Sequence, residues 1–180
     1  MKLKSLFAGL LVAALVPVAA LAQTPPAPVD KANGARECKT LLAALGENTF
    51  NATYGPNANK ANAMGKCVSA KSRSEHQNRR DAGAACALEQ QDSAFAAGHG
   101  NRTFVEFYGK GKKGTNALQQ CIQSKHKAAT TEERADTVNA ARMCKAERTS
   151  LGETAFAVRY GTNADKSNAF GKCLAKLSYD

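Results

Sequence analysis

Apolar residues recur along this chain in short groups with three- and four-residue spacing. One group, which stops at Gly46, consists of Cys38, Leu41, Leu42 and Leu45. Apolar residues at this spacing share one face of a helix, and a glycine directly after them is a typical helix end. Beyond it, Phe50 and Tyr54 are four residues apart, which predicts a second, short helix before Gly55. The pattern predicts a helical hairpin.

The hairpin pattern occurs three times. Aligned on a Tyr-Gly pair, the first and third copies agree at every offset, and NANKANAMGKC at 57–67 returns as NADKSNAFGKC at 163–173. The middle copy agrees from its glycine onward and carries six extra residues after Cys86. Each copy starts near one cysteine and ends at another: Cys38 and Cys67, Cys86 and Cys121, Cys144 and Cys173. Such a repeat indicates a modular helical architecture.

The six cysteines are expected to form disulfides, because an even number behind an export signal is typical of an oxidising compartment. The repetition favours pairing within each copy: 38–67, 86–121 and 144–173. The rival pairs 67–86 and 121–144 fail if the segments between them are helical. Nineteen helical residues span about 28 Å, whereas a bridge needs Cα atoms within about 7 Å. Free thiols are the alternative, and the absence of a C-x-x-C motif argues against zinc.

The segments between the copies are predicted to be long helices. Residues 67–91 and 121–151 contain no proline and are rich in Ala, Lys, Arg, Glu and Gln, which are good or tolerable helix formers. We expect each to be largely solvated and to carry the last cysteine of one copy and the first of the next. The predicted fold class is all-α, with three disulfide-stapled units joined by long polar helices in an elongated array.

Polar turns precede the last helix of each copy. Asn59 or Asp165 suits an N-cap, as does the later pair Asn62 and Asn168, and the middle copy favours the later position, where Asn116 stands. The residues two positions further on are expected to pack on the Phe/Tyr pair: Met64, Leu118 and Phe170. Gly65 and Gly171, beside the cysteine, are expected to allow close helix approach.

The chain starts with features of an export signal. Lys2 and Lys4 precede a short apolar stretch, and Ala20-Leu21-Ala22 predicts cleavage before Gln23. We assign 1–22 to a signal peptide, 23–33 to a Pro-rich disordered tether, 34–81 and 82–139 to the first two repeats with their linker helices, and 140–180 to the third. No second apolar stretch is long enough to span a bilayer. A secreted or periplasmic protein is expected.

The formal net charge is +10, or +8 without Lys2 and Lys4. A basic exported chain suggests a polyanion partner such as nucleic acid, envelope phosphates or acidic glycans. The turns carry the candidate anion-binding lysines: Lys60, Lys66, Lys110, Lys112, Lys113, Lys166 and Lys172. The sharpest cluster is YGKGKKG at 108–114, where backbone N–H groups before a helix could hold a phosphate. A solvated loop is the alternative interpretation.

Catalytic and metal-binding patterns are scarce in the sequence. Paired cysteines supply no nucleophile, and His76, His99 and His126 stand at no suggestive spacing to Asp, Ser or Cys. We expect them to be solvated surface histidines. Each polar turn has at most one carboxylate, too few for calcium. No catalytic residue, metal or cofactor is predicted.

The unit C…F-x-x-x-YG-x-N…NAFGKC resembles repeats of secreted bacterial proteins without a characterised function, over residues 34–176. The resemblance implies export and repeat architecture, and no activity. The sequence predicts an exported, non-enzymatic helical protein that interacts with an unknown partner at or outside the bacterial cell envelope. The alternatives are a polyanion-binding protein and a hydrolytic enzyme with a site near His99.

Overall fold

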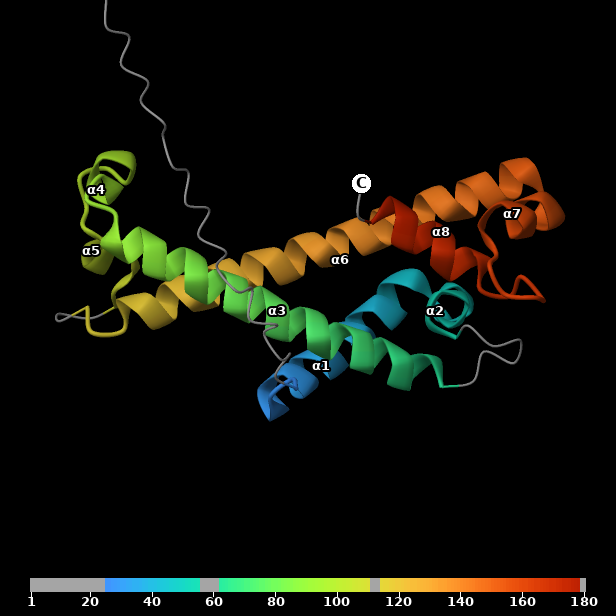
Figure 1. Ribbon diagram of the computed structural model, residues 1–180, viewed down its shortest axis with the longest axis horizontal. Helices are drawn as coiled ribbons and strands as arrows, with labels where there is room; N and C mark the ends of the chain where they lie inside the picture. The colour runs from blue at the N-terminus through green and yellow to red at the C-terminus, as the bar shows by residue number, and fades with distance from the viewer. Residues whose placement is uncertain (1–24, 56–61, 111–113, 179–180) are drawn as a thin grey trace, which may run out of the picture.

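The computed structural model describes residues 25–55, 62–110 and 114–178, and the predicted signal peptide at 1–22 lies outside them. The described part contains helices and no strand, which confirms the all-α class (Figure 1). The helices are α1 (Pro28–Leu45), α2 (Glu47–Tyr54), α3 (Ala63–Gln91), α4 (Phe95–Gly98), α5 (Phe104–Tyr108), α6 (Ala117–Leu151), α7 (Glu153–Tyr160) and α8 (Ala169–Leu177).

Three disulfides close in the predicted pattern: Cys38–Cys67, Cys86–Cys121 and Cys144–Cys173. The Cα atoms of each pair are 5.9 to 6.0 Å apart, and all six cysteines are fully buried. We call the stapled parts unit 1 (α1, α2 and the start of α3), unit 2 (the end of α3, α4, α5 and the start of α6) and unit 3 (the end of α6, α7 and α8). Their repeat relationship and the elongated outline stay predictions.

Helix α1 begins earlier than expected. The predicted tether at 23–33 overlaps it, because the helix starts at Pro28 rather than near Asn33. Proline suits the first helical position, where its missing N–H is not needed. Asp30, only 1% exposed, accepts a hydrogen bond from the backbone N–H of Ala27 at 3.0 Å. The first turn is therefore part of the folded structure, and the tether cannot extend past residue 27.

The two long helices carry the cysteines as predicted. Cys67 and Cys86 lie on α3, while Cys121 and Cys144 lie on α6. Most of their residues are solvent-accessible, as expected, but each helix also buries one face, since the two cross and pack on each other in opposite directions, with α1 against both (Figure 1). The buried face of α3 runs Cys67, Lys71, Ser72, Glu75, Ala82 and Cys86. Polar side chains thus occupy positions that aliphatic residues fill in an ordinary helix interface.

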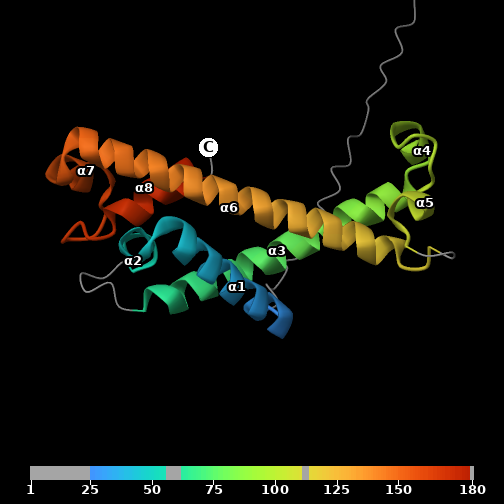
Figure 2. The ribbon, with the colours of Figure 1, turned by 180° about the vertical axis from the view of Figure 1, so that it is seen from behind.

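Units 1 and 3 meet at one end of the molecule and unit 2 lies at the other (Figures 1 and 2). Helix α8 packs on α2, and Leu45 and Ala52 of unit 1 pack against the core of unit 3. At Gly171 a Cβ atom would come within 2.8 Å of the carbonyl oxygen of Thr53. The predicted close approach at Gly171 therefore exists, and it joins two different units. At Gly65 an added Cβ would instead meet the side chain of Asn62 in the same turn.

The last helix of each unit starts at the later of the two expected positions. Asn62, Asn116 and Asn168 directly precede α3, α6 and α8. None caps its helix through the side chain. The Oδ1 atoms of Asn116 and Asn168 instead accept hydrogen bonds across the turn, each at 3.0 Å, from the backbone N–H groups of Lys110 and Thr162.

The predicted packing on the Phe/Tyr pair holds in two of the three units. Phe170 lies 6.3 Å from Phe156 between ring centroids, and Met64 packs against the unit 1 core. Leu118 of unit 2 is instead exposed. The reason is that unit 2 fills its core with Phe95, which comes from the stretch lengthened by six residues.

Candidate functional site

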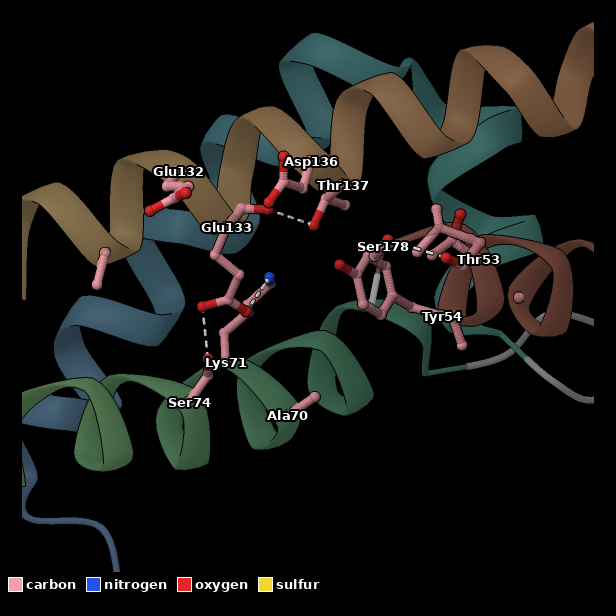
Figure 3. Close-up of a pocket in the computed structure, with 14 residues that line it drawn as sticks. Thr53, Tyr54, Ala70, Lys71, Ser74, Glu132, Glu133, Asp136, Thr137 and Ser178 are labelled. Atoms are coloured by element: carbon pink, nitrogen blue, oxygen red, sulfur yellow. Dashed lines mark hydrogen bonds and ion pairs between the residues drawn. The ribbon is translucent and has the colours of Figure 1, made fainter. Parts of the chain in front are cut away.

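A cavity of about 420 Å³ opens where units 1 and 3 meet (Figure 3). Four helices contribute to its walls, so it exists only because unit 3 folds back beside unit 1. Its lining residues are Thr53 and Tyr54 of α2, Ala70, Lys71 and Ser74 of α3, Ala129, Glu132, Glu133, Asp136 and Thr137 of α6, Gly171, Leu174 and Ala175 of α8, and Ser178. We call it the junction cavity.

An ion pair forms one wall of the junction cavity. The Nζ atom of Lys71 lies 2.7 Å from Glu133 Oε1, while the Ser74 hydroxyl donates to Glu133 Oε2 at 2.5 Å. Burial raises the pKa of the Glu133 carboxyl, but the hydrogen bonds from Lys71 and Ser74 outweigh it, so its pKa lies below the ordinary value. The carboxylate therefore stays charged beside Lys71, and the pair holds α3 against α6.

Two further carboxylates line the α6 side of the junction cavity. Glu132 and Asp136 are one helical turn apart and exposed. In the part of the chain that the structure describes, neither forms an ion pair with a basic side chain. Lys71 is the only basic residue of the lining, and Glu133 balances its charge. The cavity is thus an acidic spot on a basic chain.

The remaining surface of the junction cavity is mostly apolar. Ala70, Ala129, Leu174 and Ala175 present methyl groups, and the ring of Tyr54 lies across the cavity from Glu133 (Figure 3). Gly171 leaves room where α8 approaches α2. Cavities that combine apolar walls with a few placed polar groups are the usual form of small-ligand sites.

Next to the junction cavity, contacts between carboxylates and basic side chains continue along the interface of α1, α3 and α6. We call these pairs, together with Lys71–Glu133, the polar seam: Asp30 with His76 and Arg79, Glu37 with Arg134, and Glu75 with His126. Arg134 Nε donates to both carboxylate oxygens of Glu37, at 2.8 and 3.0 Å. These bonds hold the pKa of Arg134 above its ordinary value. The three helices are thus registered by charge rather than by aliphatic packing.

The histidines are not the solvated surface residues that we expected. His126 Nε2 lies 2.7 Å from Glu75 Oε2, and His76 Nδ1 lies 3.2 Å from Asp30 Oδ2. The ring of His99 stacks on Phe95 with 3.8 Å between centroids, and its Nδ1 donates to the Phe95 carbonyl at 2.8 Å. All three therefore have structural contacts, and the partners of His99 suit a packing role better than acid–base chemistry.

The candidate anion-binding lysines are not brought together. Lys60, Lys112 and Lys113 lie outside the described residues. Lys110 follows α5 in unit 2, whereas Lys66, Lys166 and Lys172 belong to the opposite end of the molecule (Figure 1). Lys166 Nζ donates to the carbonyl of Gly161 at 3.1 Å, so it supports its own turn. The lysines that the structure describes form two separate groups.

Sequence reasoning missed the junction cavity and the polar seam. A usable signal was present on α3, where Cys67, Lys71, Glu75, Ala82 and Cys86 keep the helical spacing of the two cysteines. Lys71 and Glu75 are charged, and charged residues on a helix are usually exposed, so we assigned them to solvent. The sequence does not mark Glu132 and Asp136 of α6 as site residues, because they line a cavity only when α8 packs nearby.

The residues that the structure describes offer neither a membrane span nor a metal cluster. No helix there is long and apolar enough to cross a membrane. No group of three or more His, Cys, Asp or Glu side chains in the same ranges could hold a metal ion.

Compared with known proteins, the chain matches no family model, no curated protein and no solved structure.

Proposed function

We propose that this chain is an exported, non-enzymatic protein that acts by binding at or outside the bacterial cell envelope. The observation that carries the proposal is the closure of all six cysteines into three buried bridges. Disulfides of this kind persist in oxidising compartments, and they leave no thiol for catalysis. The signal-like start of the sequence supports the same location.

The arrangement of ionisable groups supports binding over catalysis. Lys71, Glu75 and Glu133 are tied to partners on a facing helix. A general acid or base must reach a substrate. These groups instead hold helices together, and the hydroxyl–carboxylate contact of the junction cavity, Ser74 with Glu133, joins α3 to α6 in the same way. A binding role uses what the cavity presents, which is shape, apolar surface and charge.

The test is complementation of a deletion strain in the native host. We expect the full chain and His99→Ala to restore the wild-type phenotype, and a chain lacking residues 2–22 to fail although it accumulates in the cytoplasm. Immunoblots of each fraction under non-reducing conditions would measure export and bridge formation. Complementation by the leaderless chain would contradict export. Loss of function in His99→Ala, with normal folding and export, would favour the hydrolytic alternative.

Polyanion binding stays a second candidate because of the formal net charge of +10. Its measurement is retention of the oxidised mature chain on heparin and on DNA as a function of salt. A specific binder that neutralises several phosphates loses affinity steeply with salt, by about a thousandfold or more between 50 and 200 mM for six or more contacts. Lys66→Gln with Lys172→Gln, compared with Lys110→Gln, would show which end of the molecule contributes. Elution at low salt from both columns would remove this candidate.

A further inference from the structure

We infer that the junction cavity binds a small organic cation: a protonated amine with a short apolar chain. The inference rests on the proposed function as a binding protein and names the ligand class. It combines three features of one place, namely the open cavity between four helices, the excess of carboxylates on the α6 side, and the apolar walls from α3 and α8.

The charges of the junction cavity select a cation. Its lining contains one lysine and three acidic residues, and the 2.7 Å contact with Glu133 uses the lysine. Glu132 and Asp136 remain on the same side of α6, at the i, i+4 spacing that brings two side chains together on a helix. Elsewhere the chain is basic, so a dissolved anion is attracted to other surfaces and a cation to this one.

The apolar walls favour an organic cation over a bare ion. Ala70, Leu174 and Ala175 contribute methyl groups that stabilise an alkyl chain and give nothing to a metal ion. The ring of Tyr54 faces the same space, and an ammonium group over a tyrosine ring gains a further attraction (Figure 3). A volume of about 420 Å³ lies within the ordinary range of small-ligand sites.

The carboxylates of α6 and the apolar residues of α3 and α8 line the same cavity. Thr137, the next residue after Asp136, is 3% exposed and its hydroxyl donates to the Glu133 carbonyl at 2.8 Å. This bond fixes the Thr137 side chain beside the cavity. An ammonium group on the α6 side of the cavity can pair with Asp136 or Glu132, while its alkyl chain runs toward α8. The same chemistry is present in a free amine and in a lysine side chain.

The experiment is titration calorimetry of the oxidised mature chain with 1,5-diaminopentane, pentylamine and 1-pentanol at low and moderate salt. We expect saturable one-to-one binding of the two amines and none of the alcohol. The double variant Glu132→Gln/Asp136→Asn is expected to bind pentylamine about three- to tenfold more weakly, as two exposed carboxylates of ordinary strength would give. The matched control Asp81→Asn/Glu153→Gln removes the same charge from exposed positions elsewhere and is expected to bind like the wild type.

A second variant tests the walls. Ala129→Trp places a large ring in the cavity, and we expect it to lose amine binding while its thermal unfolding stays close to that of the wild type. If Ala129→Trp unfolds at a lower temperature than the wild type, amide chemical shifts measured during titration with pentylamine provide the test instead. Shift changes that are confined to α6 and α8, and that occur in the wild type but not in Glu132→Gln/Asp136→Asn, support the site. Competition between pentylamine and a lysine-containing tripeptide then tells the two sources apart, with the tighter ligand identifying the natural one.

Equal binding of 1-pentanol, equal loss in the control variant, or no saturation by any amine at millimolar concentration would overturn the inference. These results would leave the proposed function standing, because the complementation by His99→Ala and the failure of the leaderless chain do not depend on the ligand. Conversely, failure of those two results with intact amine binding would overturn the proposed function and keep the site.

Discussion

The two ends of this molecule build their hydrophobic cores in different ways. At one end, units 1 and 3 share their cores: Leu45 and Ala52 pack against the unit 3 core, and Val138 of α6 packs against that of unit 1. At the other end, the core of unit 2 is built from residues between Cys86 and Ile122 alone. A stapled hairpin with few aliphatic residues thus needs either a neighbour or additional residues of its own.

Unit 2 obtains those additional residues from its longer stretch after Cys86. Phe95 stacks on His99 and meets Phe104 and Phe107, with 5.5 and 5.8 Å between the phenylalanine centroids. Helix α4, which carries Phe95, has no counterpart among the helices of units 1 and 3. The six additional residues therefore take the place of a neighbouring unit, because they supply the apolar surface that units 1 and 3 obtain from each other.

A tyrosine contact is common to units 2 and 3. The hydroxyl of Tyr108 donates to Glu89 at 3.0 Å, and that of Tyr160 donates to Glu147 at 2.7 Å. Both glutamates stand three residues after the first cysteine of the unit, where unit 1 has Leu41. The pKa of Tyr108 is raised first by burial and then by Glu89, and the pKa of Tyr160 is raised chiefly by its hydrogen bond to Glu147. This contact is therefore kept at both ends of the molecule, although the cores around it are built differently.

The largest effect is expected from Phe95→Ala. Removing a buried phenylalanine costs about 3–5 kcal/mol, and no neighbouring unit can fill the space in unit 2. Hydrogen exchange should show lost protection in α4, α5 and the adjoining ends of α3 and α6, with α2 and α8 unchanged. Phe156→Ala is the matched control, expected to affect α7, α8 and α2 together. Uniform loss of protection in both variants would contradict the separation of the two ends.

Removal of one disulfide is expected to come next. Replacing Cys86 and Cys121 by alanine should lower the free energy of unfolding by about 2–4 kcal/mol, as a bridge across a loop of this size suggests. The same change at Cys38 and Cys67 should leave more local protection, because α6 and α8 still pack on unit 1. Urea unfolding followed by circular dichroism, with hydrogen exchange for location, measures both. Equal loss of local structure would show that neighbours add little.

Gly171→Ala tests the contact between units 1 and 3 directly. A Cβ atom 2.8 Å from the carbonyl of Thr53 must push α8 away from α2, at a cost of about 1–3 kcal/mol. Gly83→Ala on α3 meets no atom within 4 Å and is expected to stabilise the helix by about 0.5–1 kcal/mol. Thermal unfolding of the two variants gives the sign of each effect. Stabilisation by both would mean that α8 does not rest on α2.

Acid should weaken the junction by the smallest amount. The folded-state pKa of Glu133 is lowered, so its stabilisation is complete above the unfolded pKa of about 4.5 and disappears as the pH falls through the folded value. Because the side chain is 35% exposed, we expect no more than about 1 kcal/mol. Glu133→Gln should remove this part of the difference between urea unfolding at pH 7 and pH 3, and Glu153→Gln should not. An unchanged pH dependence in Glu133→Gln would exclude this contribution.

Much of the fold could be predicted because its signals are local. The end of α1 at Leu45, the disulfide pairs and the two long helices follow from residue spacing within each segment. The start of α1 was missed because three prolines in four positions were read as a tether, whereas the fold uses Pro28 to begin the helix. The buried face of each long helix was also missed, since charged residues are assigned to solvent unless their partners on another helix are known.

By itself, the sequence determined the staples, the two long helices and the end of α1 at Leu45, because helix periodicity and loop closure act between residues that are near in the chain. Only the tertiary structure decided that unit 3 lies beside unit 1, that Lys71 meets Glu133 and that Glu37 meets Arg134, partners 62 and 97 residues apart. Which face of a polar helix is buried depends on the charges of the helix that packs on it. The junction cavity follows from that packing alone.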